Sequence, residues 1–240
     1  MMFFKFNSNK YSFKPNLIPF IAFLCAFAIL TSLSTWQFKR LNWKTKLISE
    51  RIESFEKDPV PFKKIDSPEK NEFRKILIEG ELLNQHEMYM PALSKRGNNG
   101  FHILVPLKTI DGKRIIYDTG WIPLKMKEPK QRVENIVSGT KLFQAVIRTS
   151  GRKGYFQPEN DLATNTWFFV EPESMSNFTN IELEDFYYLE AYKNGPNGFP
   201  LGNQTRIYLR NNHLQYALTW MMIAMGLIGV FLFANIKKIK

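Results

Sequence analysis

The sequence of 240 residues contains one cysteine, Cys25, and three histidines. One cysteine excludes a disulfide framework within the chain and argues against a cysteine-ligated metal site. The three histidines, His86, His102 and His213, follow no spacing typical of a metal site. The sequence also lacks a serine in a nucleophile elbow and a glycine-rich loop between a strand and a helix. Because no convergent set of reactive groups is recognisable, we expect that the protein is not an enzyme.

Acidic residues are missing from both ends of the chain. All 22 of them lie between Glu50 and Glu190, and the formal net charge of +11 depends heavily on six lysines in the two tails. Without those lysines, 27 basic residues stand against 22 acidic ones. This is an ordinary mixed surface, so we expect no nucleic acid among the partners. The six tail lysines are Lys5, Lys10, Lys14, Lys237, Lys238 and Lys240.

Two long segments contain no charged residue. The first runs from Leu17 to Thr35, and the second runs from Tyr216 to Ile236. A helix of about 20 apolar residues crosses the hydrocarbon core of a membrane, so each segment predicts a transmembrane helix. A cleaved signal peptide is the alternative for the first segment. The segment is longer than the usual apolar region of about 7–15 residues, however, and no small-x-small cleavage site follows it.

Two spans place both tails on the same side of a membrane. The positive-inside rule predicts cytoplasmic lysine tails and a periplasmic middle. The N-terminal tail is too poor in arginine and serine for a mitochondrial transit peptide, so we expect a bacterial inner membrane. Four basic residues just past the first span favour the opposite orientation for that helix, namely Lys39, Arg40, Lys44 and Lys46. The expected division is a cytoplasmic tail (1–16), a first span (17–36), a periplasmic β-rich domain with a helical stalk (37–212), a second span (213–236) and a cytoplasmic tail (237–240).

The middle of the chain has the pattern of a β domain. Helical periodicity first continues from Trp36 to Phe55 as an amphipathic stalk. The clearest hairpin then joins Phe101–Ile110 to Arg114–Ile122 through Asp111-Gly112, a dipeptide favoured in tight turns. The expected class is an α+β membrane protein in which two transmembrane helices flank a mainly antiparallel small barrel or sandwich with short helices. Further predicted elements are strands at 75–82, Leu142–Arg148, Trp167–Val170, Phe186–Tyr192 and Arg206–Leu209, and a helix near Pro172–Phe178.

His213 is the most informative histidine because it stands at the outer edge of the second span. An ionisable residue is costly there and is often functional. At 100° per residue, Tyr216 and Trp220 lie within about 60° of it on the helix. Such a face could hold a flat macrocycle through axial ligation by the imidazole, while Arg206 and Arg210 could pair with carboxylates. The alternative is an aromatic belt that only anchors the helix at headgroup depth.

Both ends of the chain resemble the Surfeit-locus (Surf) family. Residues 34–48 resemble its WQ-x-x-R-x-x-WK-x-x-LI segment, and residues 211–220 resemble its N-x-H-x-x-YA-x-TW segment. Residues 120–123 match its RGWVP element, although Thr119 replaces the usual arginine and puts in doubt a charged role at that position. The matching residues include Trp36, Gln37, Arg40, Trp43, Gly120, Trp121 and Pro123.

This resemblance covers nearly the whole chain and implies an assembly factor for cytochrome c oxidase. It implies transient binding of haem a and its insertion into the large oxidase subunit, with that subunit, the haem a synthesis machinery and membrane lipid as partners. His213 corresponds to the family's candidate haem ligand, so the expected cofactor site comprises His213, Tyr216, Trp220, Arg210 and Arg206. A cofactor-free scaffold for oxidase subunit intermediates is the alternative. A membrane-tethered sensor or hydrolase is a third, weaker hypothesis.

Overall fold

The computed structural model describes residues 7–8, 11–151 and 153–238. The chain forms two compact units, one made of residues 1–49 and 209–240 and the other of residues 50–208. We call them the helical unit and the β unit. The tail residues Lys5, Lys10 and Lys240, on which part of the predicted topology depends, lie outside the described residues.

Two long helices dominate the helical unit. Helix α1 (Leu17–Glu56) has 40 residues and α3 (His213–Asn235) has 23 residues. Both are long and apolar enough to cross a membrane. Helix α1 continues without a break from the uncharged segment into the predicted stalk, and its last residues belong to the β unit. The two helices that the uncharged segments predict are therefore confirmed.

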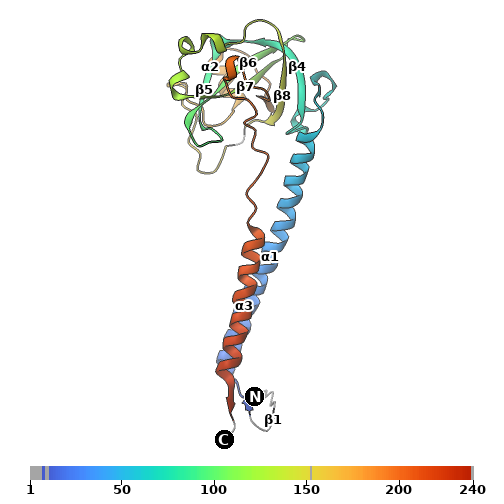
Figure 1. The fold of residues 1–240 in the computed structure, drawn as a ribbon, viewed down its shortest axis with the longest axis vertical. Helices are drawn as coiled ribbons and strands as arrows, with labels where there is room; N and C mark the ends of the chain where they lie inside the picture. The colour runs from blue at the N-terminus through green and yellow to red at the C-terminus, as the bar shows by residue number, and fades with distance from the viewer. Residues whose placement is uncertain (1–6, 9–10, 152, 239–240) are drawn as a thin grey trace. The chain divides into compact units, whose positions relative to one another are not determined.

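Helices α1 and α3 lie side by side in the helical unit and run in opposite directions (Figure 1). Near one end, the rings of Phe23 and Phe231 stack with their centroids 4.2 Å apart. Near the other end, the hydroxyl of Ser34 donates a hydrogen bond of 3.0 Å to the carbonyl of Ala217. Ala217 and Ala224 are buried in this contact, because small side chains allow two helix backbones to approach closely.

Short strands from both ends of the chain form a small sheet. Strand β2 (Tyr11–Phe13) pairs antiparallel with β1 (Asn7–Ser8) and with β10 (Ile236–Lys238). In the second pairing Phe13 lies opposite Ile236. This sheet was not predicted, and it joins the segment before α1 to the segment after α3.

Five strands of the β unit close into a barrel. Around the ring, β4 pairs with β8, β8 with β9, β9 with β7, β7 with β6, and β6 again with β4. All of these pairs are antiparallel except β7 with β9. Strands β3 and β5 extend the sheet beside β4 and β6. The strands are β3 (Val60–Pro61), β4 (Lys75–Leu82), β5 (Met88–Leu93), β6 (Asn99–Thr109), β7 (Arg114–Pro123), β8 (Lys141–Thr149) and β9 (Tyr187–Ala191).

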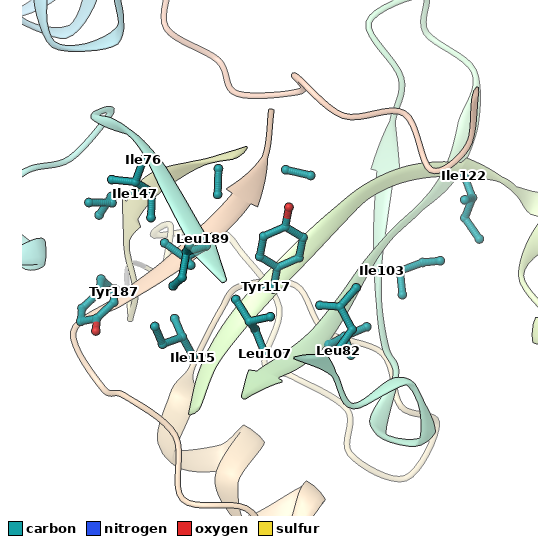
Figure 2. Close-up of a cluster of buried hydrophobic side chains, with 14 residues drawn as sticks. Ile76, Leu82, Ile103, Leu107, Ile115, Tyr117, Ile122, Ile147, Tyr187 and Leu189 are labelled. Carbon is teal, nitrogen blue, oxygen red and sulfur yellow. The ribbon is translucent and has the colours of Figure 1, made fainter. Parts of the chain in front are cut away.

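Successive side chains of these strands point to opposite faces of the sheet, so they form two hydrophobic clusters. Inward-pointing residues such as Ile103, Leu107, Tyr117 and Leu189 fill the barrel (Figure 2). On the outer face, a second cluster around Trp167 packs beneath the short helix α2 (Pro172–Thr179). The predicted α+β class with a mainly antiparallel small barrel is confirmed. Single turns of 3-10 helix occupy Phe62–Lys64, Pro68–Lys70, Asn84–His86, Leu124–Met126, Pro129–Gln131, Val133–Asn135 and Pro196–Gly198.

Two predicted strands are wrong. At Trp167–Val170 the apolar run forms no strand. Only the Trp167 backbone N–H donates to β5, at the carbonyl of Tyr89, whereas the backbone N–H groups of Phe168 and Phe169 donate to the side-chain oxygen of Asn160. At Arg206–Leu209 the described chain has no paired strand. The residues just before that segment are fixed by a side chain, because the hydroxyl of Thr205 donates to Glu190. The apolar run at Trp167–Val170 therefore indicated a buried segment correctly but not its backbone pairing, whereas at Arg206–Leu209 both Arg206 and Tyr208 are exposed.

Candidate functional site

His213 is the first residue of α3, and its imidazole is tied to α1. Its Nδ1 atom lies 2.7 Å from the side-chain oxygen Oε1 of Gln37. Because a carbonyl oxygen can only accept, Nδ1 must carry the proton and donate it. When the imidazole is neutral, this contact leaves Nε2 unprotonated with a free lone pair, which is the form that coordinates iron.

Gln37 holds this arrangement firmly because its side chain is buried between the two helices. Only 9% of the residue is exposed. One turn earlier on α1, Ser34 makes its hydrogen bond to the α3 backbone at Ala217. Beyond the helix end, the side-chain amide of Asn211 donates to the hydroxyl of Thr45 at 3.2 Å. Three contacts at successive levels thus fix the start of α3 against α1.

Aromatic side chains surround this end of the helix pair. Tyr216 is exposed and Trp220 is half-buried, and both share a face of α3 with His213. On α1, Trp36 and Trp43 are exposed, and the guanidinium of Arg40 lies over the Trp43 ring at 4.3 Å from its centroid. An imidazole flanked by exposed aromatic rings could bind a flat apolar ring system, and the same rings suit the headgroup region of a membrane.

The two predicted arginines belong to different units. Arg210 lies three residues before His213, and it forms two hydrogen bonds of 2.8 and 2.9 Å with the side-chain oxygen of Asn212 when that amide is oriented to satisfy both groups. Arg206 belongs to the β unit, where its charge acts on His102. The helical unit therefore brings together His213, Tyr216, Trp220 and Arg210 from the predicted site, and Arg206 is placed separately.

Residues 120–123, the third family-like segment, form the end of strand β7 in the β unit. Gly120 has a φ of 118°, and a Cβ atom there would lie 2.3 Å from the carbonyl oxygen of Leu201. The backbones of Trp121 and Leu201 exchange hydrogen bonds of 2.9 and 2.7 Å, and the Trp121 indole donates to the carbonyl of Ala92. Thr119, in place of the family arginine, donates to the carbonyl of Ile103. This element holds the chain after the barrel against β7.

A polar cluster on the outer face of the barrel was not foreseen. The Nδ1 atom of His102 lies 2.7 Å from Oδ2 of Asp118, and both side chains are largely buried. Burial opposes the charged imidazole, but the charge of Asp118 and its hydrogen bond outweigh that effect and raise the pKa of His102. Nearby, Glu190 accepts hydrogen bonds from Arg148 and Tyr188.

The same cluster anchors the segment that follows the barrel. Glu190 also accepts a hydrogen bond from Thr205, so one buried carboxylate connects β8, β9 and the chain beyond. Burial is the largest influence on Tyr188 and raises the pKa of its hydroxyl well above the ordinary value. Among the described residues no group of three or more His, Cys, Asp or Glu side chains could hold a metal ion. The hydrogen bonds to Glu190 hold the segment after the barrel against β8 and β9.

Gln37 belongs to a family-like motif at the outer end of the first span, but its direct contact with His213 was not predicted. The two residues are 176 positions apart, and no local pattern links them. One signal was present, however, because each residue stands at the same end of its predicted span. The His102–Asp118 pair left no such signal, since it depends on the register between β6 and β7.

Comparison with known proteins agrees with these features. A family model described as the SURF1 family matches residues 24–225. Surfeit locus protein 1 of Takifugu rubripes is 29% identical over 87% of this chain and 93% of its own length, and that of Mus musculus is 30% identical over 85% and 69%. A SURF1-like protein of Rickettsia felis is 27% identical over 91% and 95%. Because the family model matches residues 24–225, which is most of its length, the chain belongs to the SURF1 family.

Proposed function

We propose that this protein is a membrane-anchored assembly factor for cytochrome c oxidase that holds haem a through Nε2 of His213. Membership of the SURF1 family supports the general role in oxidase assembly. The single observation that supports the haem proposal is the hydrogen bond from His213 to Gln37, which leaves Nε2 as an acceptor. We propose no catalysis by the protein itself.

The residues of the helical unit fit haem a chemically. A metal-binding histidine usually donates its other ring N–H to a fixed acceptor, which sets the tautomer and the ring orientation. Gln37 supplies that acceptor. Tyr216 and Trp220 offer aromatic surface on the same helix face, and Arg210 offers a guanidinium for a propionate.

The proposed location is a bacterial inner membrane, with both termini in the cytoplasm and the middle of the chain in the periplasm. The pairing of β2 with β10 supports a common side for the two ends. It places Lys237 opposite Ser12 and Lys238 opposite Tyr11, so lysines after α3 lie beside the segment that precedes α1. The positive-inside rule then favours the cytoplasm for that side. The proposed partners are the large oxidase subunit, the haem a synthesis machinery and membrane lipid.

An absorbance spectrum tests the haem proposal. The full chain is purified from cells that make haem a, as the wild type and as the variants His213→Ala and His86→Ala. His86 is a half-buried histidine of the β unit and serves as the matched control. The wild type and His86→Ala should carry a haem a band, whereas His213→Ala should lose most of it. An equal band in all three would remove His213 as the ligand.

A cofactor-free scaffold for oxidase subunits is the second candidate. It is favoured by Tyr155 and Phe156, adjacent aromatic residues that are each 95% exposed and touch one another edge to face. Exposed aromatic residues of this kind often anchor protein contacts. If the scaffold role is correct, His213→Ala will still retain the large oxidase subunit on purification, whereas replacing both aromatics with serine will release it.

A further inference from the structure

The barrel contains a cavity that the proposed haem site does not use. Its volume is about 270 Å³, and its lining includes the interior side chains Leu82, Ile103, Val105, Tyr117, Phe143 and Ala191. We call this space the barrel cavity. It lies entirely within the β unit, so an inference from it does not rest on haem binding by the helical unit.

One polar group in the wall of the cavity has no partner. Tyr117 is only 3% exposed, and no described residue forms a hydrogen bond with its hydroxyl. Figure 2 shows the ring in the middle of the core, with the hydroxyl directed away from Leu107 and Ile115. Burial raises its pKa, so the group is a neutral phenol that can donate. Tyr117 lines the cavity, so a ligand or water there can accept its hydrogen bond.

The lining also carries an uncompensated positive charge. Lys141 and Lys193 both line the cavity and are exposed, and no acidic side chain of the described residues forms an ion pair with either. The cavity has one carboxylate, Glu87, but Arg132 binds both of its oxygens. Tyr89 donates a further hydrogen bond to Glu87. The charge available to a ligand is therefore that of the two lysines, which favours an anion.

The register of the strands orders these groups along the barrel. Tyr117 lies opposite Leu189 on β9, and Lys193 follows four residues later in the chain, past the end of that strand. On β8, Ala145 lies opposite Ala191, and Lys141 precedes it by four residues. Both lysines therefore stand beyond Tyr117 in the same direction along the barrel. The Tyr117 ring directs its hydroxyl away from Leu107 and Ile115 (Figure 2), so a carboxylate in the cavity can lie between that hydroxyl and the two lysines.

The volume sets the size of the ligand. A cavity of about 150 Å³ accepts benzene, and 270 Å³ is equivalent to about nine water molecules. This is just below the usual range of about 300–1,000 Å³ for sites of drug-sized ligands. We propose that the barrel cavity binds a medium-chain carboxylate, with its chain against Ile103, Val105 and Phe143. Its carboxylate then accepts the hydrogen bond of Tyr117 and is neutralised by Lys141 and Lys193.

Photolabelling tests this proposal in the intact protein. The full chain in phosphatidylcholine nanodiscs is irradiated with a decanoic acid that carries a diazirine on its chain, and labelled peptides are identified by mass spectrometry. We expect saturable labelling of peptides from β6 and β8. An excess of decanoate should suppress this labelling, whereas the same concentration of decan-1-ol should not.

Three variants distinguish recognition of the carboxylate from nonspecific hydrophobic binding of the probe. Tyr117→Phe keeps the ring and should raise the half-saturating concentration about tenfold, as expected for loss of a hydrogen bond to a charged group. The double variant Lys141→Gln/Lys193→Gln should weaken labelling by a similar factor. The control Lys125→Gln/Lys130→Gln changes two exposed lysines that do not line the cavity and should behave as the wild type.

Several results would overturn the proposal. Labelling confined to α1 and α3 would mean that the probe reports lipid only. Equal competition by decanol would show an apolar space without recognition of an anion. Unchanged half-saturation in both Tyr117→Phe and the double lysine variant would exclude the assigned contacts, and thermal melting of each variant identifies any loss of labelling that comes from unfolding.

Discussion

Oε1 of Gln37 accepts a hydrogen bond from Nδ1 of His213 at 2.7 Å and joins α1 to α3 across 176 residues of sequence. This contact does two things at once. It fixes where the second helix begins against the first, and it decides which nitrogen of the imidazole stays free. A ligand-orienting contact of this kind typically changes metal affinity by about 10–100-fold when it is removed.

Changing Gln37 should therefore alter haem binding while His213 stays in place. Gln37→Leu removes the acceptor, and we expect haem a affinity to fall by about 10–100-fold in a titration followed by absorbance. Gln37→Glu keeps an acceptor and adds negative charge, so it should retain binding and lower the reduction potential of bound haem. Gln215→Leu, at an exposed position of α3, is the matched control. Unchanged affinity in Gln37→Leu would show that Gln37 does not position the ligand.

Stability of the β unit should decrease as the pH rises through the titration of His102. Its pKa is raised in the folded state, so the stabilisation is complete below the unfolded pKa of about 6.5. It is then lost as the pH passes the folded-state value. The charged groups that act on the imidazole are Asp118 on β7, Glu190 on β9 and Arg206.

Thermal melting of the wild type and His102→Gln between about pH 6 and about pH 9 measures this effect. The melting temperature of the wild type should exceed that of His102→Gln most at the acidic end of this range. The two melting temperatures should converge towards the alkaline end. The control His86→Gln should not change the slope. A constant difference between wild type and His102→Gln would show that the pair is not linked to folding.

Gly120 should tolerate alanine far less well than Gly112. Both residues have positive φ, 118° and 87°, so alanine strains the backbone at either position by roughly 1–2 kcal/mol. Only at Gly120 does the added Cβ meet backbone, at 2.3 Å from the Leu201 oxygen, while nothing lies within 4 Å at Gly112. We expect Gly120→Ala to lower the free energy of unfolding by about 1–3 kcal/mol more than Gly112→Ala. Equal losses in denaturant titrations would contradict the close approach.

Breaking the buried ion pair between Arg132 and Glu87 should be strongly destabilising. Their side chains are 3% and 6% exposed, so Arg132→Met leaves a buried carboxylate without its cation, at a cost of about 3–5 kcal/mol. The double variant Glu87→Leu/Arg132→Met removes both charges and should be more stable than the single variant. Denaturant titration measures both, and a double variant less stable than the single one would argue against a charge penalty.

The sequence predicted best those elements that depend on residues close together in the chain. Absence of charge marked both long helices, and Asp111-Gly112 marked the hairpin of β6 and β7. A small barrel or sandwich was expected, but the strand pair that closes the barrel was not, because the pairing of Gly80 with Thr109 joins strands that are not adjacent in the chain. The contact of Gln37 with His213 has the same origin. The strand predicted at Trp167–Val170 was wrong because a buried apolar run has the same composition whether or not it forms a strand.

Rescue of His213→Gly by free imidazole tests the central claim most directly. The variant removes the whole imidazole and leaves a space that the free ligand can fill, with Gln37 still present to accept its N–H. We predict that the purified full chain loses its haem a band in His213→Gly and regains it when imidazole is added, whereas His86→Gly keeps the band throughout. A haem a band that survives in His213→Gly without imidazole would contradict ligation by His213.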